Sequence, residues 1–263
     1  MKIAAYQFGV TGNTKDNLET IKRAISKAAE QKAELITFPE CSLSGYPPRD
    51  IPSSSDVDEG KIRDALSEIQ IMSEKYDISI IIGTIAYENG QYYNRAYYIS
   101  PRKPMQWYNK RALYGWDEDN FSAGKESGIF DIAGLRVGVR ICYEIRFPEY
   151  FRQLYLENTD LDIVLFYDVT DNEDEDRYQL IRSHIITRAV ENVTPFLTVN
   201  AISPNQTAPT CFVDASGTVY AELEKDKEGM LIYDFEKKEL DFGEQGRKRY
   251  SDILLGKEGF QVR

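Results

Sequence analysis

Apolar residues along the chain follow two spacings, and their order predicts an α/β protein with a mixed sheet. Short apolar or alternating runs predict strands at residues 2–8, 34–38, 78–85, 92–100, 105–108, 137–141, 162–167, 195–200, 210–213, 218–223 and 230–235. Apolar residues at helical spacing predict helices near residues 13–32, 61–76, 145–156 and 173–193. No repeat or low-complexity tract divides the sequence, so we expect one domain over residues 1–263.

A cysteine stands where one predicted strand gives way to a predicted helix. The β-branched run 137–141 ends at Cys142, and Pro148 falls near the start of the helical pattern, where its missing N–H is tolerated. A side chain at such an elbow is exposed, and a nearby helix N-terminus favours a thiolate over a thiol. Cys142 is therefore a candidate nucleophile, although a free cysteine is often only a small buried hydrophobic residue.

Composition limits the partners and the compartment. The formal net charge is −11, so neither a nucleic acid nor an anionic membrane is expected as a partner. No apolar run approaches the roughly 20 residues that cross a bilayer, and the N-terminal residues show no secretory signal. The three cysteines, Cys41, Cys142 and Cys211, are odd in number and far apart, which favours reduced thiols in the cytoplasm. With one histidine and no CxxC pair, no structural zinc site is expected.

A cysteine that attacks a carbonyl group needs a base for its proton and a positive pocket for the oxyanion. The single histidine, His184, lies in the middle of the predicted helix 173–193, where a structural role is favoured over a Cys–His dyad. Glu40 and Lys110 each follow a buried run directly, and α/β proteins commonly place catalytic groups at such strand ends. Taken alone, each of these two residues is more often a solvated loop charge.

Taken together, three segments resemble the signatures of the carbon–nitrogen hydrolase (nitrilase) superfamily, in the order and with the separations typical of that family. They are FPE at residues 38–40, YNK at 108–110 and ICYEIRFPE at 141–149. Shorter pieces match as well, namely EDNFSAG at 118–124, RAVEN at 188–192 and the turn at 214–217. The resemblance extends from residue 4 to about residue 235. It implies a four-layer αββα sandwich with mixed sheets, chemistry without a metal or cofactor, and pairing of protomers into a homodimer through helices.

The resemblance also implies roles for individual residues. Cys142 would be the nucleophile, and Glu40 would accept its proton and later give it to the leaving amine. Lys110, together with the backbone N–H of Tyr143, would hold the oxyanion. Glu118 would orient Lys110 and the substrate nitrogen, although Asp117 and Asp119 adjoin it. A lysine between two carboxylates stays charged, and a carboxylate sheltered from water has a raised pKa, so these roles are physically coherent.

The segment CYEIRFPE at 142–149 is similar to the motif of ω-amidase-like and deaminated-glutathione-amidase-like members, whereas nitrile-cleaving members more often have tryptophan after the cysteine. The expected function is therefore an amidohydrolase that releases ammonia and a carboxylate from a small amide through an acyl-thioester. An N-carbamoyl hydrolase is the enzymatic alternative, and a silent member acting as a scaffold or sensor is the non-enzymatic one. The segment SGYPPRD at 44–50 resembles the glutaminase domain of glutamine-dependent NAD synthetases.

Two features bear on what the substrate carries. Arg146 lies four residues after Cys142, a spacing that shares one face of an α-helix. In carbamoylase-type relatives an arginine at this place binds the substrate carboxylate; the alternative is a salt bridge to Glu144 or Glu149. The acidic run 171–176 favours the opposite, a substrate with an amine. The basic run 247–249 is either a segment that crosses to a partner protomer or a solvated stretch.

Overall fold

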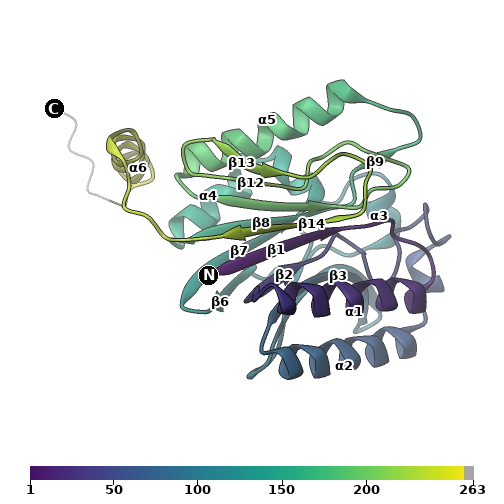
Figure 1. The fold of residues 1–263 in the computed structure, drawn as a ribbon. Helices are drawn as coiled ribbons and strands as arrows, with labels where there is room; N and C mark the ends of the chain where they lie inside the picture. Colours follow the sequence, from purple (N-terminus) through teal and green to yellow (C-terminus); the bar gives the residue numbers. More distant parts are fainter. Residues whose placement is uncertain (258–263) are drawn as a thin grey trace.

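Two six-stranded mixed sheets lie face to face, and helices cover the outer face of each sheet (Figure 1). The computed structural model describes residues 1–257. The first sheet has the order β14 (Gly229–Asp234), β1 (Lys2–Gln7), β2 (Leu35–Thr37), β3 (Ser79–Glu88), β4 (Gln91–Ser100) and β5 (Lys103–Asn109). Its strands β1, β2 and β3 are parallel, and the remaining neighbours are antiparallel.

The second sheet has the order β13 (Val219–Glu222), β12 (Cys211–Val213), β10 (Phe196–Asn200), β8 (Leu161–Phe166), β7 (Leu135–Ile141) and β6 (Ile129–Ile132). Its three central strands β10, β8 and β7 are parallel, so their C-terminal ends meet at one edge. A separate ribbon pairs β9 (Val169–Thr170) with β11 (Asn205–Gln206) beyond that edge.

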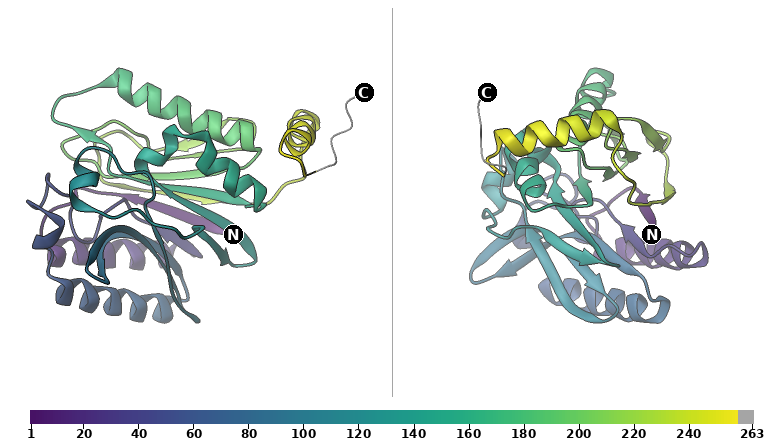
Figure 2. Two further views of the ribbon diagram at one scale, coloured as in Figure 1. Left: turned by 180° about the vertical axis from the view of Figure 1, so that it is seen from behind. Right: turned by 90° about the vertical axis from the view of Figure 1, so that its left-hand side faces the viewer.

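Helices form the two outer layers. Helices α1 (Thr14–Glu30) and α2 (Glu59–Tyr76) cover the first sheet, and α4 (Pro148–Leu156) and α5 (Glu175–Asn192) cover the second (Figure 2). Asn13 caps α1 by accepting a hydrogen bond from the N–H of Lys15, as Asn or Thr at this point predicts. Helix α6 (Phe242–Leu254) belongs to neither layer and lies beside the ends of α4 and α5 (Figures 1 and 2).

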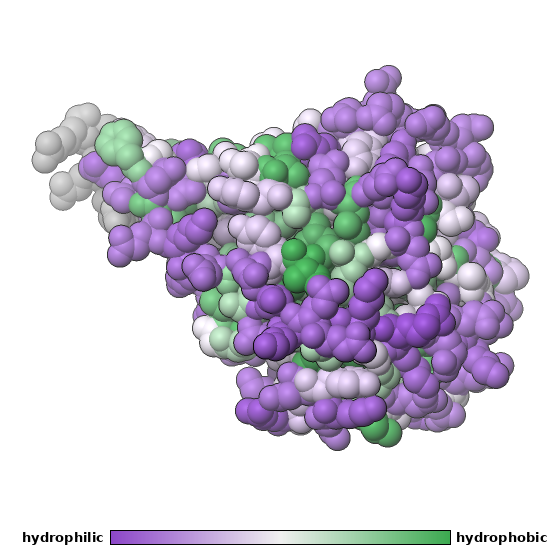
Figure 3. Space-filling model, viewed as in Figure 1, coloured by the Kyte–Doolittle hydropathy of each residue, from purple (hydrophilic) through white to green (hydrophobic). Residues whose placement is uncertain are grey.

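The apolar residues sort into three packed layers between these elements. Side chains from both sheets, such as Ile3, Leu35, Val139 and Ile163, fill the space between the sheets. Separate clusters bind each helical pair to its sheet. The predicted four-layer αββα sandwich is therefore confirmed. On the face drawn in Figure 3, most side chains are hydrophilic, and apolar ones gather over the edge strands of the two sheets.

Several elements differ from the sequence prediction, and four of them lie close to the site or at the C-terminal end of the described residues. Strand β6 occurs where the sequence predicts no element, and the short helix α3 (Trp116–Asn120) occurs where it predicts a polar loop. The segment Cys142–Arg146 is a 3-10 helix, so the α-helix predicted from residue 145 begins only at Pro148. Helix α6 was missed because it is mostly polar and holds two glycines. Its capping box, in which Asp241 and Glu244 exchange backbone-to-side-chain hydrogen bonds, is the sequence signal that marks its start.

Candidate active site

Glu40 lies just beyond β2, fully buried and fully hydrogen-bonded. One carboxylate oxygen, Oε1, accepts from the Nζ of Lys110 at 2.8 Å and from the Nδ2 of Asn94 at 2.6 Å. The other oxygen, Oε2, accepts from the backbone N–H of Tyr167 at 2.8 Å. Because Tyr167 directly follows β8, this contact ties the end of a strand in one sheet to the end of a strand in the other.

Lys110 directly follows β5 and stands between two carboxylates. Its Nζ donates to Glu40 Oε1 at 2.8 Å and to Asp117 Oδ2 at 2.7 Å. Asp117 in turn accepts a hydrogen bond at 2.9 Å from the hydroxyl of Tyr46, whose ring stacks on that of Tyr167 at 4.8 Å between centroids. The ammonium of Lys110 is therefore held in a fixed position away from bulk water.

The second carboxylate at Lys110 comes from Asp117 rather than from Glu118. Helix α3 begins at Trp116, and its first turn directs Asp117 inward while Glu118 and Asp119 are exposed. Consecutive residues of a helix point about 100° apart, so only one of three adjacent acids can face Lys110. The predicted contact between Glu118 and Lys110 is thus wrong, and the acid that replaces it is the neighbour one residue earlier.

Two glycines let the backbone approach closely behind these side chains. A Cβ atom on Gly83 of β3 would stand 2.5 Å from the carbonyl oxygen of Pro39 and 2.7 Å from the Cα of Glu40. A Cβ on Gly124 would stand 2.2 Å from the carbonyl oxygen of Asn109, next to Lys110. Any larger residue at either place would push Glu40 or Lys110 out of position.

Cys142 follows β7 directly and is half-buried, with a positive φ of 46°. A positive φ is strained for a residue with a Cβ and recurs at functional sites. The register pairs Ile141 with Leu165, so Cys142 lies beside the end of β8, close to the backbone that holds Glu40. Tyr143 is the second residue of the 3-10 helix, and its N–H has no partner within that helix.

Burial and charge set the protonation states at this site. Burial raises the pKa of Glu40 against the opposing charge of Lys110. Although burial alone would lower it, the charges of Glu40 and Asp117 raise the pKa of Lys110. Burial and the charge of Glu40 also raise the pKa of the Cys142 thiol, while Lys110 acts in the other direction. At rest the cysteine is therefore protonated beside a carboxylate that can take its proton.

A cysteine, a buried carboxylate and a buried lysine thus meet at the strand ends of this sandwich. The family model for carbon–nitrogen hydrolases matches residues 2–241. This chain belongs to the carbon–nitrogen hydrolase family. It is accordingly a hydrolase of the nitrilase superfamily that acts on C–N bonds other than peptide bonds, as the three sequence signatures predict.

Several known proteins resemble this hydrolase. A 2-oxoglutaramate amidase of Bacillus subtilis (strain 168) is 27% identical over 229 residues, which cover 84% of this chain and 85% of the relative. A glutamine-dependent NAD(+) synthetase of Acinetobacter baylyi is 31% identical over 170 residues, covering 62% of this chain and 31% of that protein. A mutant of the amidase from Nesterenkonia sp. AN1 in complex with butyramide has a TM-score of 0.82 at 21% identity, covering 98% and 96% of the two chains.

Glu144 is a structural residue of the hydrolase site that sequence reasoning assigned only as a possible partner of Arg146. Its Oε1 accepts from the hydroxyl of Tyr108 at 2.6 Å and from the N–H of Arg111 at 2.9 Å. Its Oε2 accepts from the N–H of Ile141 at 2.7 Å. Glu144 therefore joins the side chain of Tyr108 and the backbone just after Lys110 to the residue before Cys142. The only feature of the sequence that could have pointed to this role is the position of Glu144 within the third signature, residues 141–149.

Arg146, the last residue of the 3-10 helix, lies near His184 of α5. In a 3-10 helix, positions four apart are turned by about 120° from each other, so Arg146 does not share the face of Cys142 as α-helical spacing would require. Partial burial and the charges of Arg188 and Arg146 lower the pKa of His184. Within residues 1–257, no ion pair joins Arg146 to Glu144 or Glu149. Glu144 instead accepts from Tyr108, Ile141 and the N–H groups of Arg111 and Ala112.

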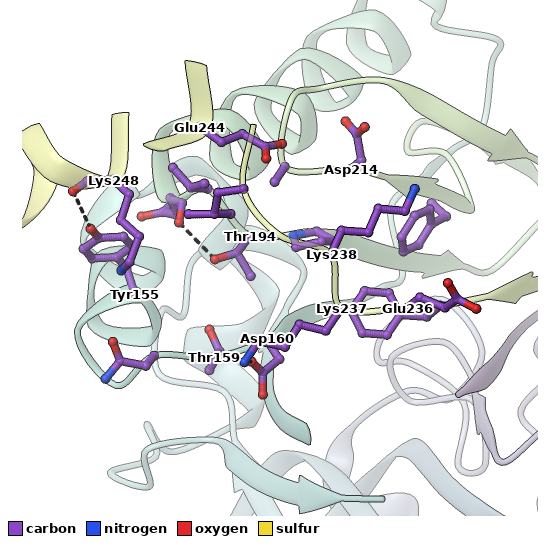
Figure 4. Close-up of a pocket in the computed structure, with 18 of the residues that line it drawn as sticks. Tyr155, Thr159, Asp160, Thr194, Asp214, Glu236, Lys237, Lys238, Glu244 and Lys248 are labelled. Atoms are coloured by element: carbon purple, nitrogen blue, oxygen red, sulfur yellow. Dashed lines mark hydrogen bonds and ion pairs between the residues drawn. The ribbon is translucent and has the colours of Figure 1, made fainter. Parts of the chain in front are cut away.

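The hydrolase has a cavity at the opposite edge of the second sheet. It has a volume of about 360 Å³ and lies between the ends of α4 and α5, the residues that lead into β8 and β10, and the segment leading into α6 (Figure 4). Its lining includes Tyr155, Asp160, Thr194, Lys237 and Glu244. None of Glu40, Lys110 and Cys142 lines it, so this cavity is separate from the candidate active site.

Two further observations concern other kinds of site and partner. Among residues 1–257, no group of three or more His, Cys, Asp or Glu side chains is arranged to hold a metal ion. Over the same residues, the helices are all too short or too polar to span a membrane.

Proposed function

We propose that this hydrolase cleaves small linear amides with Cys142 as the nucleophile, releasing ammonia and a carboxylic acid. The observation that carries the proposal is the buried Glu40–Lys110–Asp117 chain, with contacts of 2.8 and 2.7 Å, at the strand edge where Cys142 lies. Relatives that are amidases support an amide as the substrate, including a 2-oxoglutaramate amidase and an (R)-stereoselective amidase of Pseudomonas sp.

The proposed reaction has two halves. In the first, Glu40 accepts the thiol proton while the sulfur of Cys142 attacks the amide carbon, and Lys110 with the N–H of Tyr143 stabilises the oxyanion. The C–N bond then breaks as Glu40 returns the proton to the leaving ammonia, which leaves an acyl-thioester. In the second half, Glu40 takes a proton from water and the resulting hydroxide attacks the thioester carbon. The C–S bond then breaks, the acid departs, and Glu40 returns the proton to the sulfur of Cys142.

Asp117 takes the place that the resemblance assigned to a glutamate. Its negative charge balances Glu40 on the other side of Lys110, so the ammonium stays charged throughout the cycle. Tyr46 donates to the remaining oxygen of Asp117 and leaves Oδ2 for the lysine. We infer that Asp117 is the positioning carboxylate of this hydrolase and that Glu118 has no part in the reaction.

The proposed assembly is a homodimer. Helix α6 exposes large apolar side chains, with Phe242 95% exposed and Leu254 74% exposed, and it lies beside α4 and α5. A second protomer that covers α4, α5 and α6 would bury these side chains, and the basic run 247–249 lies within α6. Light scattering at micromolar protein should give twice the chain mass, and a monomer would contradict the dimer. We place the protein in the cytoplasm because its three cysteines are all free thiols.

The deciding experiment measures ammonia release from a panel of small amides, carbamoyl compounds and nitriles. Amides should be the best substrates, and Cys142→Ala and Cys142→Ser should both reduce turnover by more than about 10³-fold with the fold intact by circular dichroism. Cys211→Ala, at a cysteine buried elsewhere in the second sheet, is the control and should retain turnover. Carbon dioxide released with ammonia would indicate the carbamoyl hydrolase. No ammonia from any compound and no labelling of Cys142 by iodoacetamide would indicate the silent scaffold.

A further inference from the structure

A second arginine, Arg177, is fixed at the rim of the candidate active site. It lies in the first turns of α5, and its Nε donates to Asp168 Oδ1 at 2.8 Å. Asp168 comes two residues after β8, directly after the Tyr167 whose N–H binds Glu40. Since β7 and β8 are parallel neighbours, Asp168 and Cys142 lie at the same edge of the second sheet. Arg177 is thus anchored on the segment that also holds the proposed base.

The anchor itself is rigid. Asp168 is only 6% exposed, and its Oδ1 also accepts from the hydroxyl of Thr207. Its backbone N–H donates to Asn200 Oδ1 at 2.9 Å, and its carbonyl oxygen accepts from Asn200 Nδ2 at 2.8 Å and from the N–H of Thr207 at 2.9 Å. A side chain held by such an anchor presents its remaining donors in a fixed direction, which favours binding over a mobile surface arginine.

Only one of the three guanidinium nitrogens of Arg177 is engaged. Within residues 1–257, Nη1 and Nη2 have no hydrogen-bond partner, and the side chain is 41% exposed. Although partial burial acts to lower it, the hydrogen bond and charge of Asp168 raise the pKa of Arg177. A cation with two free, forked N–H groups therefore remains accessible close to the nucleophile.

Most acids of the run 171–176, which leads into α5, are paired within the protein, so they do not form a binding site for a substrate amine. Asp171 pairs with Arg49 at 2.8 Å, and Asp174 caps α5 by accepting from the N–H of Arg177 at 2.9 Å. Glu173 and Glu175 both face Lys225, at 3.4 and 3.5 Å. Four of the acids in this run are thus committed to partners in the protein. The amine-binding site that the sequence left open therefore loses most of its candidate carboxylates.

We propose that Arg177 binds a carboxylate at the far end of the substrate, so that the preferred substrates are monoamides of short dicarboxylic acids. The inference rests on the proposed amidase function. The forked Nη atoms suit the planar geometry of a carboxylate, and the half-exposed setting lets the substrate reach them. The contact binds the substrate without taking part in bond breaking, so it acts mainly on KM.

The test compares two amides of equal length, glutaramate with a terminal carboxylate and pentanamide with a terminal methyl group. Arg177→Gln should lower kcat/KM for glutaramate by ~10- to 100-fold through KM, and leave pentanamide within about twofold. Arg177→Lys should recover only part of the loss, because lysine has no fork. Arg182→Gln is the matched control, since Arg182 lies on the same helix but pairs with Glu222 at 2.9 Å. Equal losses on both amides, or a glutaramate-specific loss in Arg146→Lys alone, would overturn the proposal.

A binding measurement keeps this inference separate from the proposed function. Glutarate should protect Cys142 from alkylation by iodoacetamide, and Arg177→Gln should raise the glutarate concentration needed for half-protection by about tenfold or more, with pentanoate unaffected. If the wild-type protein releases no ammonia from either amide, the proposed function fails, while the protection assay still decides on Arg177. If ammonia is released and Arg177→Gln changes neither KM nor protection, the function stands and Arg177 is a structural residue.

Discussion

Two fully buried carboxyl groups, Glu40 and Asp162, show how the same burial leads to different chemistry. Glu40 stands at the end of a strand and accepts hydrogen bonds from Lys110, Asn94 and the N–H of Tyr167. Asp162 stands near the start of β8, packed against Leu154 and Gly138, and within residues 1–257 neither of its oxygens has a hydrogen-bond partner. Both groups are 0% exposed.

The difference lies in the partners rather than in the depth. Burial raises the pKa of both groups, but at Glu40 the charge of Lys110 opposes this rise and favours the ionised form, which is the form that can accept a proton. Burial raises the pKa of Asp162 to about 7, against smaller opposing effects of the Thr159 hydroxyl and the Arg140 charge. A buried carboxyl is therefore suited to act as a base where the fold supplies a cation, and is a cost to stability where it does not.

Removing the charge of Glu40 should have the largest effect. Glu40→Gln should reduce kcat by ~10²- to 10⁴-fold, the usual contribution of a general base. Either orientation of the glutamine amide also turns its NH₂ group towards a donor, Lys110 or the N–H of Tyr167. Steady-state ammonia release measures the loss, and Asp162→Asn is the control, because it makes the same change at an equally buried carboxyl and should keep wild-type turnover.

The same variant should change the thiol in a direction that simple misfolding would not produce. The charge of Glu40 helps to raise the pKa of Cys142, so Glu40→Gln should shift the midpoint of iodoacetamide alkylation to lower pH. Turnover that falls together with an unchanged or higher alkylation midpoint would contradict the assignment of Glu40 as the neighbouring base.

A smaller effect is expected at the second carboxylate of Lys110. Asp117→Asn should lower kcat/KM by ~10- to 100-fold, because it removes one charge-assisted hydrogen bond to the ammonium. Glu118→Gln, one residue later and exposed, should stay within about twofold of the wild type. The reverse ranking in the same assay would restore the role that the resemblance gave to Glu118.

The sequence predicted most strands of the two sheets from local apolar runs, and Glu40, Lys110 and Cys142 lie at or just beyond the ends of such strands. Local pattern alone left each of the three a candidate, and the resemblance of three segments in family order singled them out together. Asp117 could not be chosen over Glu118 in this way. Which of the three adjacent acids faces Lys110 depends on where helix α3 begins, at Trp116. It also depends on Tyr46, more than 70 residues earlier in the sequence, whose hydroxyl binds Asp117.

Asp162 and Arg177 show a second limit of sequence reasoning. Asp162 is one polar residue inside a strand, and no local pattern shows whether a distant side chain pairs with it. Arg177 was one charge within an acidic helix start, and its importance depends on Asp168, nine residues earlier, and on Thr207 across the fold. Elements follow from neighbours in sequence, whereas partners of buried charges follow from the assembled sandwich.

The smallest predicted effect is on stability, and it completes the comparison with Glu40. Between about pH 4 and 7 the unfolded chain releases the proton of Asp162 while the folded protein keeps it. The free energy of unfolding should therefore fall as the pH rises, by at most ~1.4 kcal/mol per pH unit, and this loss is complete above about pH 7. Asparagine cannot ionise, so Asp162→Asn should escape this loss.

Urea denaturation of both proteins at pH 5 and pH 8 measures it. The stability of Asp162→Asn relative to the wild type should increase by about 1–4 kcal/mol between the two pH values. Any cost of placing an unpaired amide in the core is the same at both pH values and cancels in this difference. Asp160→Asn, two residues away, removes an acid that Lys237 already pairs at 2.6 Å, so it should show no such gain. If the difference in stability between Asp162→Asn and the wild type does not change with pH, Asp162 has a hydrogen-bond partner or a bound water in solution. Asp162 and Glu40 would then differ only in how strongly their carboxylates are stabilised.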